Sequence, residues 1–157
     1  MAASLEAAPL QMRDLTFNKV YIEPNPAFEA ETQGSATEFD WQDVDIQVSV
    51  GLGAERDTET EDDARAGYFV HVEVTLPEAP QEGQPAPYQV SVDAYAWFSV
   101  SPAVPPEKRQ DLVSVNGASL ILGAIREQVA NITARSRFGM LALPTLRFIP
   151  EANNSTD

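Results

Sequence analysis

The sequence predicts an α+β fold: a four-stranded antiparallel sheet with one long C-terminal helix packed on it, followed by an apolar crossover loop. Between residues 10 and 100, segments alternate apolar and polar residues, which is the period of a half-buried strand. From about residue 111 the apolar residues recur at helical spacing instead. A chain of 157 residues is long enough to bury one core. Strands followed by a helix indicate an α+β arrangement.

Four segments are typical of strands, at residues 10–23, 41–52, 68–76 and 88–100. The first alternates irregularly but is rich in β-forming residues, and the other three alternate cleanly. The charged segment "GAERDTETEDDARAG" and the proline-rich segment "PEAPQEGQPAP" read as loops. The expected core faces are Val44, Ile46, Val48, Val50 and Leu52 in the second strand, Tyr68, Val70, Val72, Val74 and Leu76 in the third, and Tyr88, Val90, Val92, Ala94, Ala96, Phe98 and Val100 in the fourth.

The opposite face of the fourth strand carries Tyr95 and Trp97. Two large aromatic side chains are unusual on a face that water covers. We therefore expect another subunit or a ligand chain to cover this face.

A helix is expected from about Asp111 to Arg137, where an apolar stripe recurs at helical spacing. Its members are Leu122, Ile125, Val129 and Ile132. Leu120 and Ile121 widen the stripe, so the helix is expected to be buried on two sides, with the stripe at an oligomer interface. Gly139 lies where a C-terminal stop belongs. Residues 10–149 then form one domain, between a flexible N-terminal tail at 1–9 and a disordered C-terminal tail at 150–157.

The composition excludes several function classes. The 24 acidic residues against 10 basic ones give a net charge of −14, which disfavours nucleic acid and anionic membrane surfaces as partners. The acidity fits a basic partner, and it equally fits solubility or a salty cytoplasm. No apolar run approaches the roughly 20 residues of a membrane span, and the start "MAASLEAAPLQM" does not resemble a secretory signal. We expect a cytoplasmic protein.

Nothing in the sequence predicts catalysis, a metal or a cofactor. The single histidine, His71, has no second imidazole or thiolate nearby in the sequence, and the chain contains no cysteine. The acidic run "ETEDD" lacks the spaced ligands and glycine of a calcium loop. There is no glycine-rich phosphate loop and no G-x-S-x-G turn. We therefore expect a protein that is not an enzyme.

One stretch carries a resemblance to a known family. Residues 120–148, "LILGAIREQVANITARSRFGMLALPTLRF", resemble the helix and crossover loop of the SecB protein-export chaperones, L-x-F-P-[YF]-x-R-E followed by R-x-x-F-P-x-L-x-L-x-P-[VI]-x-F. The alignment has no gap, and Arg126 and Glu127 match the R-E pair. "FDWQ" at residues 39–42 and "YAWFSV" at 95–100 are similar to further family positions, so the resemblance covers roughly residues 10–148.

The resemblance implies a chaperone that binds unfolded precursor proteins, keeps them export-competent and passes them to the translocation motor SecA. It implies a dimer of dimers, with the long helices packed between two sheets. In the family, the crossover loop helps to form the wall of an apolar client groove. The residues expected to bind client are Phe138, Met140, Leu141, Leu143, Leu146 and Phe148, together with Tyr95 and Trp97. The crossover residues could instead fold back over the core, and their apolar character fits both readings.

Two departures from the family pattern affect the expectation. Where the family's first strand carries K-D-x-S-F-E, this chain reads "NKVYIE". Glu23 keeps one motor-docking acid, but Lys19 replaces the other, so we expect weak SecA docking. The nine residues after Phe148 are too short and polar to supply the family's C-terminal helix. The alternative function is a SecB-like interaction protein dedicated to one partner, such as an antitoxin, with no general export role.

Overall fold

The computed structural model describes residues 4–55 and 67–149. The tail expected to be disordered at 150–157, and most of the charged loop predicted at 53–67, lie outside these residues. Of the expected N-terminal tail, residues 4–9 are described and are exposed.

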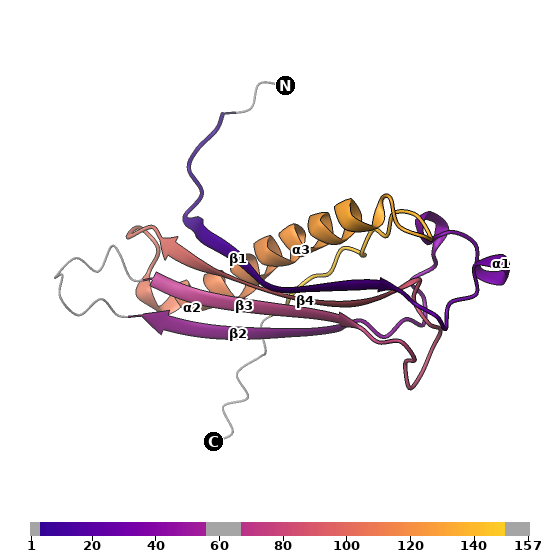
Figure 1. The fold of residues 1–157 in the computed structure, drawn as a ribbon. Coiled ribbons are helices and arrows are strands. Elements are labelled where there is room, and N and C mark those ends of the chain that lie inside the picture. The colour runs from indigo at the N-terminus through magenta and orange to yellow at the C-terminus, as the bar shows by residue number, and fades with distance from the viewer. Residues whose placement is uncertain (1–3, 56–66, 150–157) are drawn as a thin grey trace, which may run out of the picture.

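The sheet has four strands: β1 (Leu10–Pro24), β2 (Gln47–Glu55), β3 (Gly67–Leu76) and β4 (Tyr88–Val100). Their order is β1-β4-β3-β2, and every neighbouring pair is antiparallel. The predicted fold class is therefore confirmed (Figure 1). The second strand begins later than expected because residues 41–46 form a loop. Gln84 holds this loop, since its side-chain amide donates to the carbonyls of Asp40 and Gln42 at 2.9 and 3.3 Å.

The alternation in β3 and β4 separates a core face from a second face. Every residue predicted for the core face of β4 is buried. In β3 the same holds from Val70 to Leu76, whereas Tyr68 is half-buried. We call the buried side of the sheet the inner face and the other side the outer face.

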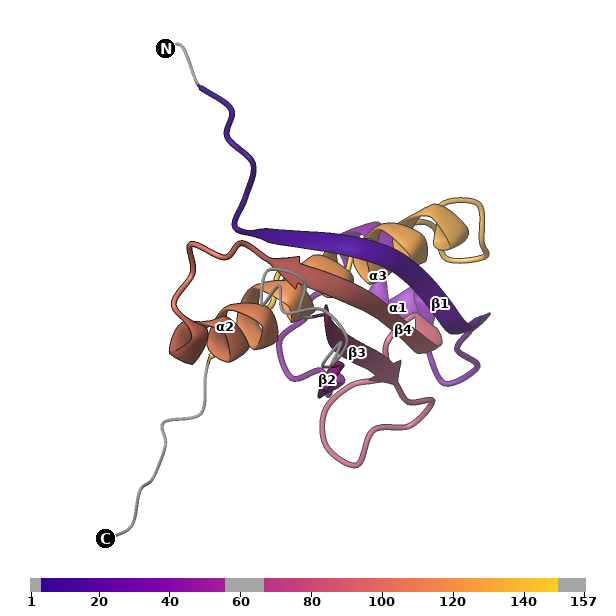
Figure 2. The same ribbon diagram turned by 90° about the vertical axis from the view of Figure 1, so that its left-hand side faces the viewer.

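One continuous helical segment covers the inner face (Figures 1 and 2). It consists of α2 (Pro106–Leu112), a π-helical turn η3 (Val113–Gly117) and α3 (Ala118–Thr133). The helix starts earlier than the predicted Asp111, since proline at the first position fits the helical backbone. Within the π turn, Gly117 lies so close to the sheet that a Cβ would stand 3.3 Å from the Phe98 ring.

The helix ends before the predicted Arg137. Thr133 is buried, and its hydroxyl donates to the Val129 carbonyl at 2.7 Å and accepts from the Leu141 amide at 2.8 Å. The chain therefore leaves the helix at this point and turns back over the inner face. Gly139 has a φ of +85° in this turn, a conformation that glycine adopts without strain.

Residues 140–149 form the crossover segment, which runs back beside α3 (Figure 1). Leu141 and Leu143 are buried in the core, and Leu146 and Phe148 pack half-buried against it. The Nε of Arg126, on α3, donates to the Leu143 carbonyl at 2.9 Å. The apolar crossover is thus part of the core.

Tyr88 fixes the start of this return. Its hydroxyl donates to the Gly139 carbonyl at 2.8 Å and accepts from the Phe138 amide at 2.9 Å. The Phe138 carbonyl in turn accepts from the amide of Ala36, the first residue of the short helix η1 (Ala36–Glu38), which follows α1 (Ala30–Gln33). One buried side chain therefore connects the sheet with the crossover segment.

We predict that Tyr88→Phe lowers the free energy of unfolding at neutral pH by about 1–3 kcal/mol, because two buried backbone groups lose a partner. Burial raises the pKa of Tyr88 above its ordinary value of 10.0, so folding favours the neutral phenol. This contribution is complete below pH 10 and is lost as the pH rises through the folded-state pKa. Urea unfolding between neutral pH and pH 11 or so measures both effects. The prediction is contradicted if Tyr88→Phe is as stable as wild type at neutral pH, or if it loses as much stability as wild type at alkaline pH. Tyr68→Phe is the control.

We predict that Arg126→Met keeps the fold but loosens the crossover segment, since the Leu143 carbonyl loses its donor. The expected loss is about 1–3 kcal/mol, with faster amide exchange at residues 140–149 than in β3 and β4. Hydrogen exchange followed by mass spectrometry checks this. Glu127→Gln changes the exposed neighbour of Arg126 and should leave exchange unchanged. Equal protection in Arg126→Met and wild type would show that the contact does not hold the segment.

Candidate functional site

Three aromatic side chains gather on the outer face of the sheet. Phe69 of β3 lies with its ring centroid 5.2 Å from that of Tyr95 and 5.2 Å from that of Trp97, both on β4. All three are half-buried, and none belongs to the core cluster or packs against it. We call Phe69, Tyr95 and Trp97 the aromatic patch.

Glycines border the patch on two sides. Gly53 of β2 is paired with Phe69, and a Cβ there would lie 3.7 Å from the Phe69 Cβ. Gly67, at the start of β3, would place a Cβ 3.5 Å from the Trp97 ring. Because these positions carry no side chain, nothing from either one shields the rings. The patch is an open apolar surface, the kind that marks interaction sites.

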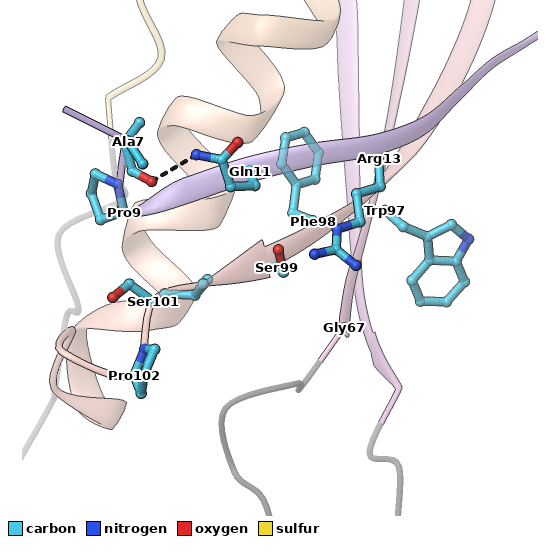
Figure 3. A pocket seen from close by; sticks show the side chains of 12 residues that line it. Ala7, Pro9, Gln11, Arg13, Gly67, Trp97, Phe98, Ser99, Ser101 and Pro102 are labelled. Carbon is cyan, nitrogen blue, oxygen red and sulfur yellow. Dashed lines mark hydrogen bonds between the residues drawn. The ribbon is translucent and has the colours of Figure 1, made fainter. Parts of the chain in front are cut away.

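A cleft of about 980 Å³ adjoins the patch, between the start of β1 and the end of β4 (Figure 3). Arg13 and Trp97 are register partners on neighbouring strands and lie side by side at its wall. The lining residues are Ala7, Ala8, Pro9, Gln11, Arg13, Gly67, Trp97, Phe98, Ser99, Val100, Ser101 and Pro102. This lining is largely apolar, and among the residues that the structure describes Arg13 is its single charged member.

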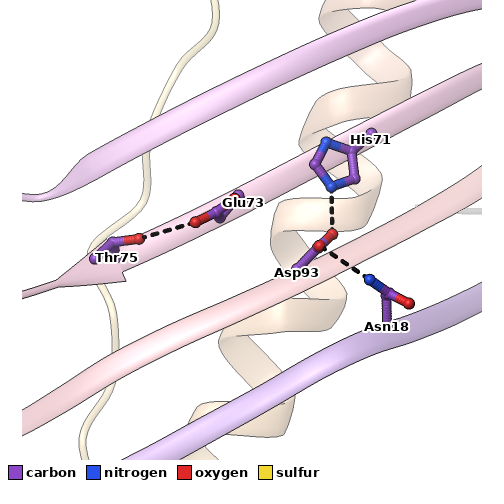
Figure 4. Close-up of polar contacts among 5 residues, drawn as sticks. All are labelled: Asn18, His71, Glu73, Thr75 and Asp93. Atoms are coloured by element: carbon purple, nitrogen blue, oxygen red, sulfur yellow. Dashed lines mark hydrogen bonds and ion pairs between the residues drawn. The ribbon is translucent and has the colours of Figure 1, made fainter.

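The other half of the outer face is polar (Figure 4). Nε2 of His71 forms an ion pair with Oδ1 of Asp93, and Asn18 donates to the other Asp93 oxygen at 3.2 Å. Among the described residues, no group of three or more histidine, cysteine, aspartate or glutamate side chains could hold a metal ion. His71 is therefore paired within the sheet, and its surroundings suggest a structural role.

The crossover residues predicted to bind client have different surroundings. Leu141 is fully buried and Leu143 is 3% exposed, so neither can contact a client without a change in the fold. Leu146 and Phe148 are half-buried, and only Met140 is well exposed, at 41%. Leu141 and Leu143 therefore fold back over the core, which is the second of the two interpretations of this segment.

Phe138 lies in a second aromatic cluster, beyond the end of α3. Its ring centroid is 5.0 Å from that of Phe28 and 5.8 Å from that of Tyr88, and the Arg137 guanidinium lies 5.3 Å above it. Phe28 and Phe138 help to line a cavity of about 680 Å³, together with Glu29 and Glu31. This cavity combines apolar rings with two carboxylates and the guanidinium of Arg137.

The helical stripe expected at an oligomer interface is mostly inside the chain. Leu122, Ile125 and Val129 are 3% exposed or less and pack in the core. This differs from the expectation, because the sheet and crossover segment of the same chain already cover them. Ile132 remains exposed, as does Leu120. Any helix-mediated contact with a second copy therefore has to use the solvent side of α3.

Glu23 lies exposed near the end of β1 and accepts a hydrogen bond of 2.7 Å from the Tyr21 hydroxyl. This bond raises the pKa of Tyr21. Lys19, which replaces an acid of the family pattern, is the register partner of Asp93. The outer face thus carries a lysine beside the His71–Asp93 pair.

Sequence reasoning identified Tyr95 and Trp97 but missed Arg13, Phe28 and the glycine border as parts of these sites. The alternation placed Phe69 on the outer face, but as a lone aromatic residue on that face of its strand it was not recognised as part of a site. The glycines at 51, 53 and 67, opposite an aromatic strand, are the signal that could have indicated an open surface.

No known family model matches this sequence, and no curated protein matches it. Among solved structures, the chain is similar to the Mycobacterium tuberculosis SecB-like chaperone Rv1957 in complex with a peptide from the HigA1 antitoxin, at a TM-score of 0.52 and 15% identity over 88% of each chain. It is also similar to a protein of unknown function from Streptococcus agalactiae, at a TM-score of 0.49 and 15% identity over 91% of this chain and 100% of the other. In the described part of the chain, no helix has the length and apolarity to cross a membrane. The first similarity shows that the chain has a SecB-like fold.

Proposed function

We propose that this protein is a chaperone-like binding protein, and not an enzyme, that holds unfolded or non-native polypeptide. The observation that carries the proposal is the uncovered aromatic patch of Phe69, Tyr95 and Trp97, next to a cleft of about 980 Å³. Apolar surface left in water costs about 25 cal/mol per Å², so a partner that covers these rings gains that energy. Non-native chains expose the apolar and aromatic side chains that fit such a surface.

The edge of the sheet supports binding of an extended client. β2 pairs with β3 on one side only, in a continuous register without a bulge. Its residues 47–53, "QVSVGLG", contain no charge and no proline, the features by which proteins usually protect an edge. An added strand would find free backbone groups there and apolar contacts at the exposed Val50 and Leu52. Backbone recognition of this kind tolerates many client sequences.

The acidic charge supports the same role. A net charge of −14 keeps a loaded complex soluble and favours clients that carry some basic residues. The second cavity, lined by Phe28, Phe138, Glu29, Glu31 and Arg137, adds a smaller place where an apolar client side chain can lie beside charged groups of both signs.

The alternative is one dedicated polypeptide partner. The similar mycobacterial chaperone was solved with a peptide from an antitoxin, and a partner of this kind suits the open surface equally well. Delivery of clients to SecA is a narrower form of the first proposal. With Lys19 beside Asp93 and Glu23 engaged by Tyr21, we expect SecA docking to be weak.

The test is suppression of aggregation of a chemically unfolded substrate. We expect the wild type to protect, and Tyr95→Ser/Trp97→Ser to lose several-fold in protection, because the rings leave the surface but not the core. Tyr21→Ser removes an exposed aromatic residue of the same face outside the patch and should protect like wild type. Unfolding curves first establish that all three proteins are folded.

Two results would redirect the proposal. If the double variant protects as well as wild type, the binding surface is elsewhere, and the Phe28–Phe138 cavity is the next candidate. If the wild type protects none of several unfolded substrates, a dedicated partner becomes the better explanation.

We also expect a dimer or tetramer in solution. Leu120 and Ile132 on α3, and Met12 and Val20 on β1, are exposed apolar residues that a second copy can cover. Charge repulsion at −14 per chain opposes this, so assembly should strengthen as salt shortens the Debye length to about 3 Å at 1 M. Size-exclusion chromatography with light scattering at low and high salt measures the mass. A monomer at high protein concentration in both conditions would contradict the expectation.

A further inference from the structure

We infer that the cleft beside Trp97 selects a polypeptide segment in which an acidic side chain stands next to apolar or aromatic ones. The acidic side chain pairs with Arg13, and its apolar neighbours lie against Trp97. This inference rests on the proposed polypeptide binding and names the kind of segment that the outer face takes.

The first argument is the state of Arg13. It is exposed, and within residues 4–55 and 67–149 its guanidinium makes no hydrogen bond or ion pair. Arg109 and Arg126 donate to the carbonyls of Val104 and Leu143, whereas the other described arginines, at 135, 137 and 147, also form no hydrogen bond or ion pair. The place of Arg13 in the cleft is what sets it apart. Among the described residues, Arg13 is also the only charged side chain lining the cleft. An unpaired guanidinium is a rigid fork of donors that matches a carboxylate.

The backbone of β1 presents Arg13 to the cleft. The register with β4 shifts between Arg13 and Thr16, and Asp14 in the shift has a φ of +51°. Such a bulge changes the direction of the neighbouring side chains. Arg13 stays opposite Trp97 on the outer face, and the two lie together at the cleft wall (Figure 3). Charge and aromatic surface are therefore offered side by side.

The size and lining of the cleft define the rest of the ligand. A volume of about 980 Å³ is at the upper end for small-molecule sites and has room for several side chains of a peptide. The remaining lining is alanine, glycine, proline, valine and aromatic surface, with the Gln11 amide and the hydroxyls of Ser99 and Ser101. These walls favour apolar side chains around the single ionic contact.

The net charge of −14 limits how acidic the ligand can be. A strongly acidic chain would be repelled by the protein as a whole, whereas one carboxylate at Arg13 gains a local contact. The preferred segment therefore carries one acidic side chain among apolar ones. We assign the carboxylate to a side chain and not to a chain terminus, because a surface for unfolded chains meets mostly internal segments.

The experiment compares three apolar, aromatic-containing peptides by fluorescence polarisation, all with the fluorophore coupled to the N-terminal amine, so that none has a free amino terminus. The first is C-terminally amidated with one central glutamate, the second replaces this glutamate by glutamine, and the third is the glutamine peptide with a free C-terminal carboxylate. We expect the glutamate peptide to bind the wild type about tenfold more tightly than the other two, and Arg13→Gln to remove the difference. Lys19→Gln removes the same charge from the outer face outside the cleft and should preserve it.

Each remaining outcome overturns the inference. If the first two peptides bind the wild type equally well, the cleft does not recognise the acidic side chain, although the protein still binds polypeptide. Tight binding of the free-carboxylate peptide alone reassigns the site to a chain terminus. A preference that survives in Arg13→Gln places the recognition elsewhere. If no peptide binds, the inference fails, and the aggregation assay still decides the proposed function independently.

Discussion

The return of the chain over the inner face is the constraint on which the rest of the structure depends. Tyr88, Thr133 and Arg126 each hold a backbone group of the turn or crossover segment, at distances of 2.8–2.9 Å. These contacts bring Leu141 and Leu143 into the core. Since buried backbone groups need partners, the loop can be apolar and buried only because these three side chains supply them. The helix and crossover segment then share the task of covering the sheet.

The two faces of β4 separate the core from the proposed binding surface. Toward the helix it presents Ala94 and Ala96, whose small size lets α3 approach closely. Alternating with them, Tyr95 and Trp97 point the other way and stay half-buried. Because alternate residues of a strand face opposite sides, the aromatic patch can be changed without opening the core. The proposed binding surface is thereby separable from the core, whereas a binding groove built on Leu141 and Leu143 would not be.

Much of the fold followed from the sequence, because period-two and helical patterns are local signals. The strands at 68–76 and 88–100 and the outward direction of Tyr95 and Trp97 could be predicted in this way. The burial of Leu141 and Leu143 could not, since a loop has no period and its partners, Tyr88 and Arg126, are distant in sequence. The same holds for the stripe at Leu122, Ile125 and Val129: its burial was predictable, but whether its own sheet or a second copy covers it was not.

Arg13 illustrates a further limit of sequence reasoning and explains why the outer face matters. In the sequence it is one basic residue in an irregular strand, and only the bulge at Asp14 and the register with Trp97 place it at a cleft. On a chain with a charge of −14, an unpaired guanidinium beside aromatic rings creates a local field opposite to the global one. The negative charge of the whole chain would attract basic segments of a client from a distance, and Arg13 would pair with one client carboxylate at contact. Both can act on the same client, because salt screens the long-range attraction more than the close ion pair. If the outer face binds polypeptide as proposed, such a surface would discriminate among extended chains by charge pattern, while its backbone edge and rings would tolerate many sequences.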